Sequence, residues 1–220
     1  MPGAPHERPG LPSSLYHPLD PAAVNRVAED AFRVLAEGGV AVYCRTGFEA
    51  FRAAGAEVDE ETRVVRLSRS LVEDAIASNP SSITLYGRDG SNDCVLERNR
   101  VHYGTGGTAI HVIDPDSGKR RPSTVADVIL NARLVQALDH IHLFTINVFP
   151  NEIEDPEEID VNRFFHALDN TSKHVMGGIY TMQGCQDVVA MCRQIAGGAD
   201  ALQERPFVSF ITLIISPFKI

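Results

Sequence analysis

The sequence predicts an α/β protein, in which a mixed α+β region precedes a partial (β/α)8 TIM barrel of about four strands. Apolar strands begin near residues 141, 174 and 207, and this spacing of about 33 residues matches one strand–helix unit of such a barrel. The strands are continuously apolar and alternate with amphipathic helices, which is typical of a parallel sheet covered by helices. A doubly wound open sheet is the competing architecture.

Three regions are expected along the chain. Residues 1–19 are rich in proline and are predicted to form a disordered tail, residues 20–100 an α+β N-terminal region, and residues 101–220 the first half of a barrel. The last strand, over residues 207–216, is the most apolar in the chain and lies at its end. A parallel strand there would have an uncovered face and an unpaired edge, so we expect that a longer fold has been truncated.

In the N-terminal region, a helix is predicted to begin at Asp20-Pro21, an N-cap followed by proline in the first turn, and to end at Gly38-Gly39. Further predicted elements are strands over 40–44 and 64–68, helices over 47–55 and 70–78, and two strands within 81–104 joined by a turn. The helical spacing of the apolar residues Val24, Val27, Ala28, Ala31, Phe32 and Leu35 predicts that this helix is amphipathic.

In the barrel region, a hairpin over 112–122 is expected before a helix that starts at Thr124, where Thr124 and Asp127 form a capping box. Strands over 141–149 and 173–180 alternate with helices over 157–170 and 183–196, and Gly197 ends the last of these helices. The residues predicted to face inward are Val125, Val128, Ile129, Ala132, Val135, Ile159, Phe164, Phe165, Leu168, Cys185, Val188, Val189, Cys192 and Ile195.

Composition excludes several classes of protein. A net charge of −9 with scattered basic residues disfavours nucleic-acid binding, because that binding depends on neutralising phosphates. The sequence has neither a secretory h-region nor a run of about 18 apolar residues, so no membrane association and a cytoplasmic location are expected. The four cysteines lack the spacing of zinc or redox motifs and are expected to be reduced.

The segment VHYGTGGTAIHVI contains Gly104, Gly106 and Gly107, which follow a short strand. A dinucleotide site is poorly supported, because its glycines open a helix, whereas here a strand-like run follows. The glycines either let the backbone approach a ligand or form a turn that needs positive φ. A cradle for a sugar phosphate or nucleotide is a further alternative.

Two other features could bind cations. His140 and His142 have the spacing of metal ligands, but they open their strand, and barrel active sites lie at strand C-terminal ends, so no metal site is expected. Glu152 lies in an acidic segment before a helix and could face a cationic substrate, although a solvated loop is the simpler interpretation.

Several segments, in one order, resemble a known family. They include FEAFRAAGAEVDEETRVVRL, LVEDAIASNPSSITLYGRDGSND, YGTGGTAIHVIDPDSGKRRPST, DNTSKHVMGGIYT and RPFVSFITLIISPFKI. Together they resemble the trimethylamine:corrinoid methyltransferases and their relatives that act on quaternary amines such as glycine betaine. The resemblance, over residues 24–220, implies a (β/α)8 barrel about twice as long as this chain, of which this chain is similar to the N-terminal half.

The resemblance implies transfer of a methyl group from a methylated amine to the cobalt of a corrinoid carried by a separate protein. Some members carry pyrrolysine, in the half that this chain does not match. The reaction needs positioning in a dry pocket, and aromatic rings can hold a methylated cation. Catalytic residues are not assigned; the residues expected at the strand ends, facing substrate or corrinoid, are Tyr103, Gly104, Thr105, Gly106, Gly107, Asn147, Phe149, Gly178, Tyr180 and Ser216.

An alternative function is a non-catalytic half-barrel module that assembles as a homo-oligomer through its apolar edge. Since a barrel site draws residues from several strands, we expect no methyl transfer by this chain alone.

Overall fold

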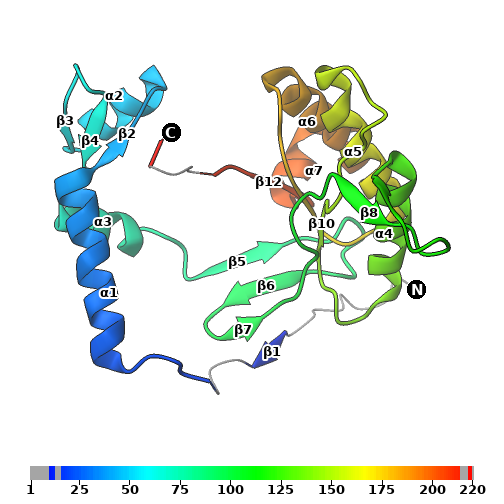
Figure 1. Cartoon of the computed structure of the whole chain (residues 1–220), viewed down its shortest axis with the longest axis horizontal. Coiled ribbons are helices and arrows are strands. Elements are labelled where there is room, and N and C mark those ends of the chain that lie inside the picture. The colour runs from blue at the N-terminus through cyan, green and yellow to red at the C-terminus, as the bar shows by residue number, and fades with distance from the viewer. Residues whose placement is uncertain (1–9, 13–15, 214–217, 220) are drawn as a thin grey trace. The chain divides into compact units, whose positions relative to one another are not determined.

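A computed structural model describes residues 10–12, 16–213 and 218–219 (Figure 1). The chain divides into two compact units: Ser14–Ser81 with Leu213–Ile220, and Met1–Ser13 with Ser82–Thr212. The first is called the smaller unit and the second the larger unit. Residues 82–100 therefore belong with the later strands, while the division into tail, N-terminal region and barrel stays a prediction.

The smaller unit contains the helices and strands predicted before residue 80. Asp20 caps α1 by accepting a hydrogen bond from the Ala23 amide at 2.7 Å, and Gly39, with φ of 73°, ends the π-helical turn η1 that follows. Strands β2, β4 and β3 form an antiparallel sheet in that order around a small core of Val40, Val42, Phe48 and Val65. The elements are α1 (Pro21–Arg33), η1 (Val34–Gly38), β2 (Val40–Ala41), α2 (Arg45–Ala53), β3 (Glu57–Val58), β4 (Val64–Arg66) and α3 (Arg69–Ala77).

The predicted first helix is found as α1, and its apolar face is largely exposed in the described residues. Val24 is 50% and Val27 61% exposed, and no residue of α1 is buried. The contacts of this helical segment with the rest of the unit include an ion pair of Glu29 with Arg69 at 2.6 Å, the Arg69 guanidinium 4.6 Å from the Phe32 ring, and Leu35 packed on the core. Periodicity identifies an apolar face but not what covers it.

The larger unit begins with antiparallel pairs. The two strands expected within 81–104 are β5 (Ser82–Leu85) and β6 (Cys94–Glu97), which pair with each other. The expected hairpin is β8 (His111–Ile113) with β9 (Arg120–Pro122). Strand β1 (Leu11–Pro12) pairs with β7 (Arg100–Val101).

A parallel sheet of β10 (Phe144–Thr145), β11 (Val175–Gly178) and β12 (Val208–Ile211) follows, in chain order. Parallel bridges from Gly104 to Leu143 and from Ala109 to Val148 place the glycine segment beside β10, as the preceding strand would lie in a barrel. The described residues form no closed barrel. The α/β class is confirmed, and the recurrence of the strands matches their predicted spacing.

Helices α4 (Val125–Ala137), α5 (Pro156–Asn170), α6 (Met182–Ala196) and α7 (Ala199–Glu204) accompany this sheet (Figure 1). The predicted capping box is confirmed, since the Asp127 carboxylate accepts from the Thr124 amide at 2.9 Å, and Gly197 ends α6 with φ of 85°. No helix in the described part of the chain is long and apolar enough to cross a membrane. The core contains Val128, Ala132, Val135, Phe144, Ile146, Val148, Phe164, Ala167, Leu168, Val175, Val188, Cys192 and Phe207.

Two of the residues predicted to face inward, Phe165 and Ile195, are exposed instead. Phe165 is 48% and Ile195 41% exposed. The buried face of α5 is centred on its neighbour Phe164, and about 100° of helical rotation carries Phe165 away from that face.

Lys173 is a buried cation that the sequence did not reveal. Its side chain is fully buried, and Nζ donates hydrogen bonds to the carbonyl oxygens of Val135, Leu138 and Ile141 at 2.6, 2.7 and 2.6 Å. Val135 lies in the last turn of α4 and Leu138 caps it, where a positive charge is favourable to the helix dipole. Lys173 thereby joins the end of α4 to the chain that enters β11.

We expect Lys173→Met to lower the free energy of unfolding by about 3 kcal/mol, because three carbonyl groups would lose their buried donor. Urea denaturation followed by circular dichroism measures this. Lys119→Met, at an exposed position, is the matched control. A loss no larger than that of the control would contradict the importance of the ammonium group.

His174 predicts a pH dependence of stability. Its ring is 2% exposed, with Nδ1 3.0 Å from the Tyr86 carbonyl oxygen and Nε2 2.9 Å from the Ser209 hydroxyl. Burial lowers the pKa of His174 below its ordinary value of 6.5. The unfolded chain therefore binds this proton more readily, so the stability contributed by the neutral ring is present above pH 6.5 and is lost as the pH falls below it.

Between pH 6.5 and 5.5 we expect the unfolding free energy to fall with a slope of up to about 1.4 kcal/mol per pH unit from this group. His174→Asn keeps a donor for Tyr86 but cannot be protonated, and should flatten the slope. His140→Asn, at an exposed position, is the control. An unchanged slope in the His174 variant would refute this assignment.

Candidate functional site

The C-terminal ends of the parallel strands bring two predicted aromatic residues together. Phe149 follows β10 and Tyr180 follows β11, and their ring centroids lie 5.7 Å apart at an interplanar angle of 85°. Tyr180 is 51% exposed. The two rings form an edge-to-face pair where barrel enzymes carry their active sites, and we call this place the strand mouth.

The glycine segment runs alongside β10 toward the strand mouth. The Thr105 hydroxyl donates to the carbonyl oxygen of Thr145, and the Thr108 hydroxyl to that of Ile146 at 3.2 Å. The Ala109 amide donates to the Asn147 carbonyl oxygen at 2.8 Å. The buried side-chain oxygen Oδ1 of Asn147 has no hydrogen-bond partner.

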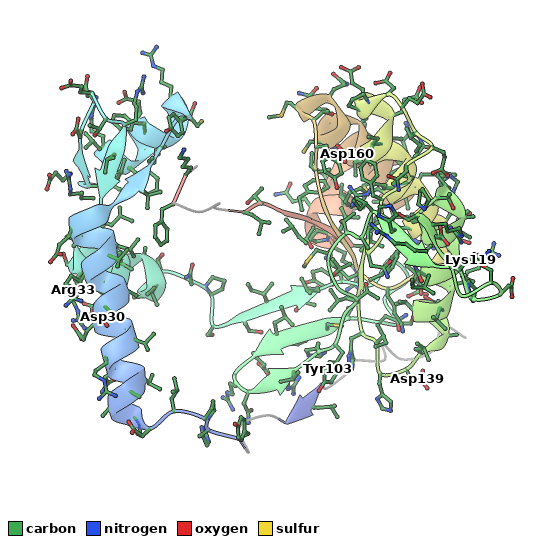
Figure 2. The ribbon with its side chains drawn as sticks, in the orientation of Figure 1. Asp30, Arg33, Tyr103, Lys119, Asp139 and Asp160 are labelled. Atoms are coloured by element: carbon green, nitrogen blue, oxygen red, sulfur yellow. The ribbon has the colours of Figure 1, made fainter. Side chains whose placement is uncertain are left out.

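Tyr103 and Gly104 lie at the other end of this segment. The Tyr103 amide donates to His142 Nδ1 at 3.0 Å, and Gly104 pairs with Leu143, both of which precede β10. Figure 2 shows Tyr103 well separated from Asp160, a neighbour of Tyr180, within the larger unit. The structure therefore gathers Thr108, Phe149 and Tyr180 at the strand mouth, but not Tyr103. Ser216, also expected there, lies outside the described residues.

The glycines do not form a turn that requires positive φ, so that alternative is wrong. None of Gly104, Gly106 and Gly107 has a positive φ. A Cβ on Gly104 would lie 2.9 Å from Leu143 Cγ, so packing explains this glycine. Gly106 and Gly107 are exposed, and a Cβ on either would meet nothing within 4 Å. Steric fit inside the chain does not account for these two.

A buried charge pair lies beneath the strand mouth. The side chains of Asp160 and Arg163 in α5 are both 0% exposed, with 3.6 Å between Oδ1 and Nη1. Asp160 Oδ2 accepts from the amides of Tyr180 and Thr181 at 2.9 and 3.2 Å. Burial lowers the pKa of Arg163 from its ordinary value. The burial of Arg163 could have been predicted from the helical periodicity. Arg163 lies four residues after Ile159 and four before Ala167, on the buried face of α5.

Arg163 touches three parts of the strand mouth. Nη1 donates to the Gly178 carbonyl oxygen at 3.3 Å and Nη2 to the Thr108 hydroxyl at 3.4 Å. Its Cζ lies 4.9 Å from the centroid of the Tyr180 ring. One face of the Tyr180 ring thus lies against the protein's own cation, while about half of the residue stays exposed.

The other polar candidates have structural partners. His142 is buried beside Tyr103, whereas His140 is exposed. Glu152 accepts a hydrogen bond from the Val125 amide at 2.6 Å and so binds the beginning of α4. Among the described residues, no three His, Cys, Asp or Glu side chains gather as a metal site would require.

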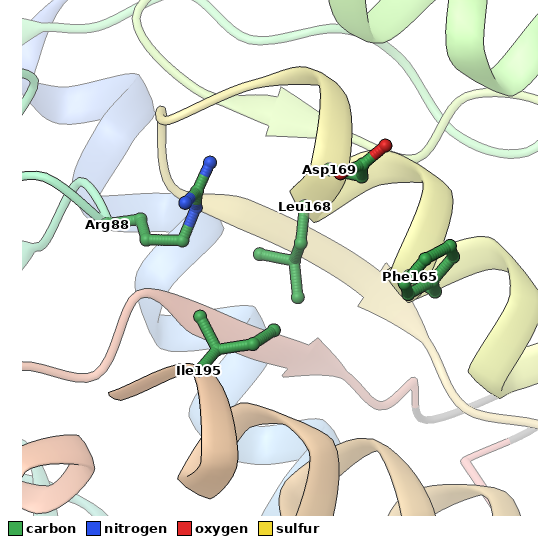
Figure 3. Close-up of a pocket in the computed structure, with 5 residues that line it drawn as sticks. All are labelled: Arg88, Phe165, Leu168, Asp169 and Ile195. Carbon is green, nitrogen blue, oxygen red and sulfur yellow. The ribbon is translucent and has the colours of Figure 1, made fainter. Parts of the chain in front are cut away.

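A small pocket of about 160 Å³ lies elsewhere, lined by Arg88, Phe165, Leu168, Asp169 and Ile195 (Figure 3). Leu168 and Asp169 are at the C-terminal end of α5 and Ile195 at that of α6. These helices run against the strands they connect, so the pocket is near the strands' N-terminal ends. In a barrel this end contributes stability rather than catalysis.

The family model for trimethylamine methyltransferase (MTTB) matches residues 6–220. The chain belongs to the trimethylamine methyltransferase family. This confirms the resemblance read from the spaced segments. The match runs through both units, and thus includes the strand mouth and the charge pair beneath it.

Individual members of the trimethylamine methyltransferase family show how much of a relative the chain matches. Trimethylamine methyltransferase MttB of Desulfitobacterium hafniense is 36% identical over 187 residues, which are 85% of this chain and 38% of the relative. Glycine betaine methyltransferase of the same species is 26% identical over 205 residues, 93% of this chain and 42% of the relative. Trimethylamine methyltransferase MttB of Methanosarcina thermophila is 32% identical over 144 residues. The chain thus spans about two fifths of the first two relatives.

The glycine segment generates a prediction that separates packing from ligand access. Gly104→Ala should destabilise the fold by about 1–3 kcal/mol, because its Cβ would overlap the buried Leu143 side chain. Gly106→Ala and Gly107→Ala, with open space around them, should leave stability unchanged or raise it by up to about 1 kcal/mol. Thermal unfolding compares the three variants. A large loss in the Gly106 or Gly107 variant would show that these positions are structural.

Proposed function

We propose that this chain supplies the first strands of a (β/α)8 barrel that transfers a methyl group from a methylated amine to the cobalt of a corrinoid carried by a partner protein. The amine is trimethylamine or a quaternary amine such as glycine betaine. The observation that carries the proposal is the family match over residues 6–220, with relatives named as trimethylamine and glycine betaine methyltransferases. Parallel strand segments in chain order, accompanied by helices, support the barrel. A cytoplasmic location is part of the same proposal.

The strand mouth suits a methylated amine. Phe149 and Tyr180 offer aromatic surface, and a cation over an aromatic ring gains about 0.5–2 kcal/mol. Arg163 is paired with Asp160, so the pair adds no net charge that would repel a cationic substrate. The chain's own residues would hold the methyl carbon in line with its acceptor and exclude water, which are the main requirements of this transfer.

The exposed glycines fit a large partner-borne group. Gly106 and Gly107 carry no side chain, and the space where a Cβ would stand is open. Together with Thr105, this part of the segment could lie against a corrinoid ring without steric conflict. The corrinoid would supply the cobalt nucleophile that accepts the methyl group.

A second candidate is a half-barrel assembly module without catalysis. Strand β12 pairs only with β11 in the described sheet, so its other edge is open to another chain. Size measurement in solution distinguishes the two functions: a compact dimer that takes up no methylated amine supports the module.

The methyl-transfer proposal is tested by incubating the chain with reduced corrinoid protein and a panel of methylated amines while following cobalt methylation by absorbance. We expect no transfer by the chain alone, because a barrel site takes residues from several strand ends. Adding the remaining part of the D. hafniense MttB should restore transfer from one class of amine. Methyl transfer by the chain alone would refute the expectation that its part of the site is insufficient. Failure with every amine after the remaining part of MttB is added would refute the proposed reaction.

A further inference from the structure

The pair of Asp160 and Arg163 is costly to bury and is only partly satisfied. Two charges removed from water need close pairing and full hydrogen bonding to repay their desolvation. Here the closest pairing distance is 3.6 Å, and both Asp160 Oδ1 and Arg163 Nε lack a hydrogen-bond partner. An apolar pair of similar volume would stabilise a helix–sheet contact at least as well. Stability by itself therefore does not explain these residues.

Asp160 fixes the backbone that carries Tyr180. Its Oδ2 accepts from two successive amides, those of Tyr180 and Thr181, at the connection between β11 and α6. The first turn of α6 lies directly on this carboxylate: a Cβ on Gly184 would be 2.5 Å from Oδ2. The Thr181 hydroxyl caps the same turn through the Gly184 amide at 2.8 Å. The position of this connection is therefore set by one buried carboxylate.

Arg163 fixes the ring of Tyr180. The guanidinium lies over the ring and is held by carbonyl and hydroxyl oxygens from β11 and from the glycine segment. Since Arg163 is buried and Tyr180 is half exposed, the cation supports the ring from the protein interior while part of the ring stays accessible. Phe149 meets the same ring edge to face.

We infer that Asp160 and Arg163 are positioning residues that set the orientation of Tyr180 at the strand mouth, a role that rests on the proposed function where it concerns substrate. Asp160 places the backbone of Tyr180 and Arg163 places its ring. Thr108 connects the arrangement to the glycine segment, so three stretches of chain that are distant in sequence share one buried support.

Arg163 could orient the Tyr180 ring or merely compete with a ligand for it, and the two roles predict opposite effects of removing Arg163 on cation binding. If Arg163 only occupies one face of Tyr180, removing it makes the ring a better cation binder. If Arg163 orients the ring, removing it weakens cation binding although a positive charge has been taken away. The probe is tetramethylammonium chloride, which carries the methylated cation and no other functional group.

The experiment uses the whole chain with 15N-labelled tyrosine. The sequence has five tyrosines and no tryptophan, so few amide signals appear, and Tyr180→Phe assigns the relevant one. In Arg163→Met we expect a shifted or broadened Tyr180 amide signal and about fivefold or greater weakening of tetramethylammonium binding, the size of one lost cation–π contact. Arg133→Met, which replaces an exposed arginine of α4, should change neither.

Arg163→Lys keeps the positive charge, so the buried Asp160 keeps a cationic partner. This variant therefore tests the role of Arg163 even if Arg163→Met does not fold. Its ammonium cannot reproduce the planar contact with the ring, so the Tyr180 signal should shift again, while circular dichroism stays that of the wild type. An unchanged Tyr180 signal in both Arg163 variants, or equal or tighter binding of the cation, would overturn the inference. If the wild-type chain binds no tetramethylammonium, the proposed substrate site fails, and the Tyr180 signal alone decides whether Arg163 positions the ring.

Discussion

The ammonium group of Lys173 holds together the beginning of the parallel sheet. A parallel strand needs a helical connection on the outside of the sheet, and the helix leaves carbonyl groups unsatisfied where it ends. Lys173 supplies donors to that end and lies two residues before β11, so the same side chain ties the end of α4 to the chain that enters β11. The connection at the opposite end of β11 depends on Asp160 in a similar way. Buried charges, rather than turn sequences alone, place both ends of this strand.

Local chemistry allowed much of the fold to be predicted from sequence. The capping box at Thr124 and the glycine stop at Gly197 depend on neighbouring residues only, and both are found. Whether an apolar face becomes buried depends on distant residues, which explains why Val24, Phe165 and Ile195 are exposed. A pattern shows that a face is apolar, but packing partners decide whether it is covered.

The positions of the candidate residues were predicted in part, while their role at a site stays a prediction. Phe149 and Tyr180 could be assigned because strands of known direction place their ends together. Tyr103 lies away from these two rings, since the segment that it begins runs beside β10 from His142 and continues past the glycines. Asp160 and Arg163 were missed because charged residues on a helix are usually solvated, and their burial depends on the β11–α6 connection folding over them.

The imidazole of His174 also affects how β5 and β12 open locally. Its two nitrogens bind Tyr86, directly after β5, and Ser209 in β12, so a hairpin and an edge strand that are far apart in sequence share one ring. Neither partner can separate without leaving a buried polar atom of this ring unsatisfied. The amides of β5 and β12 should therefore exchange with solvent deuterium as one cooperative unit, rather than each fraying separately from its own end.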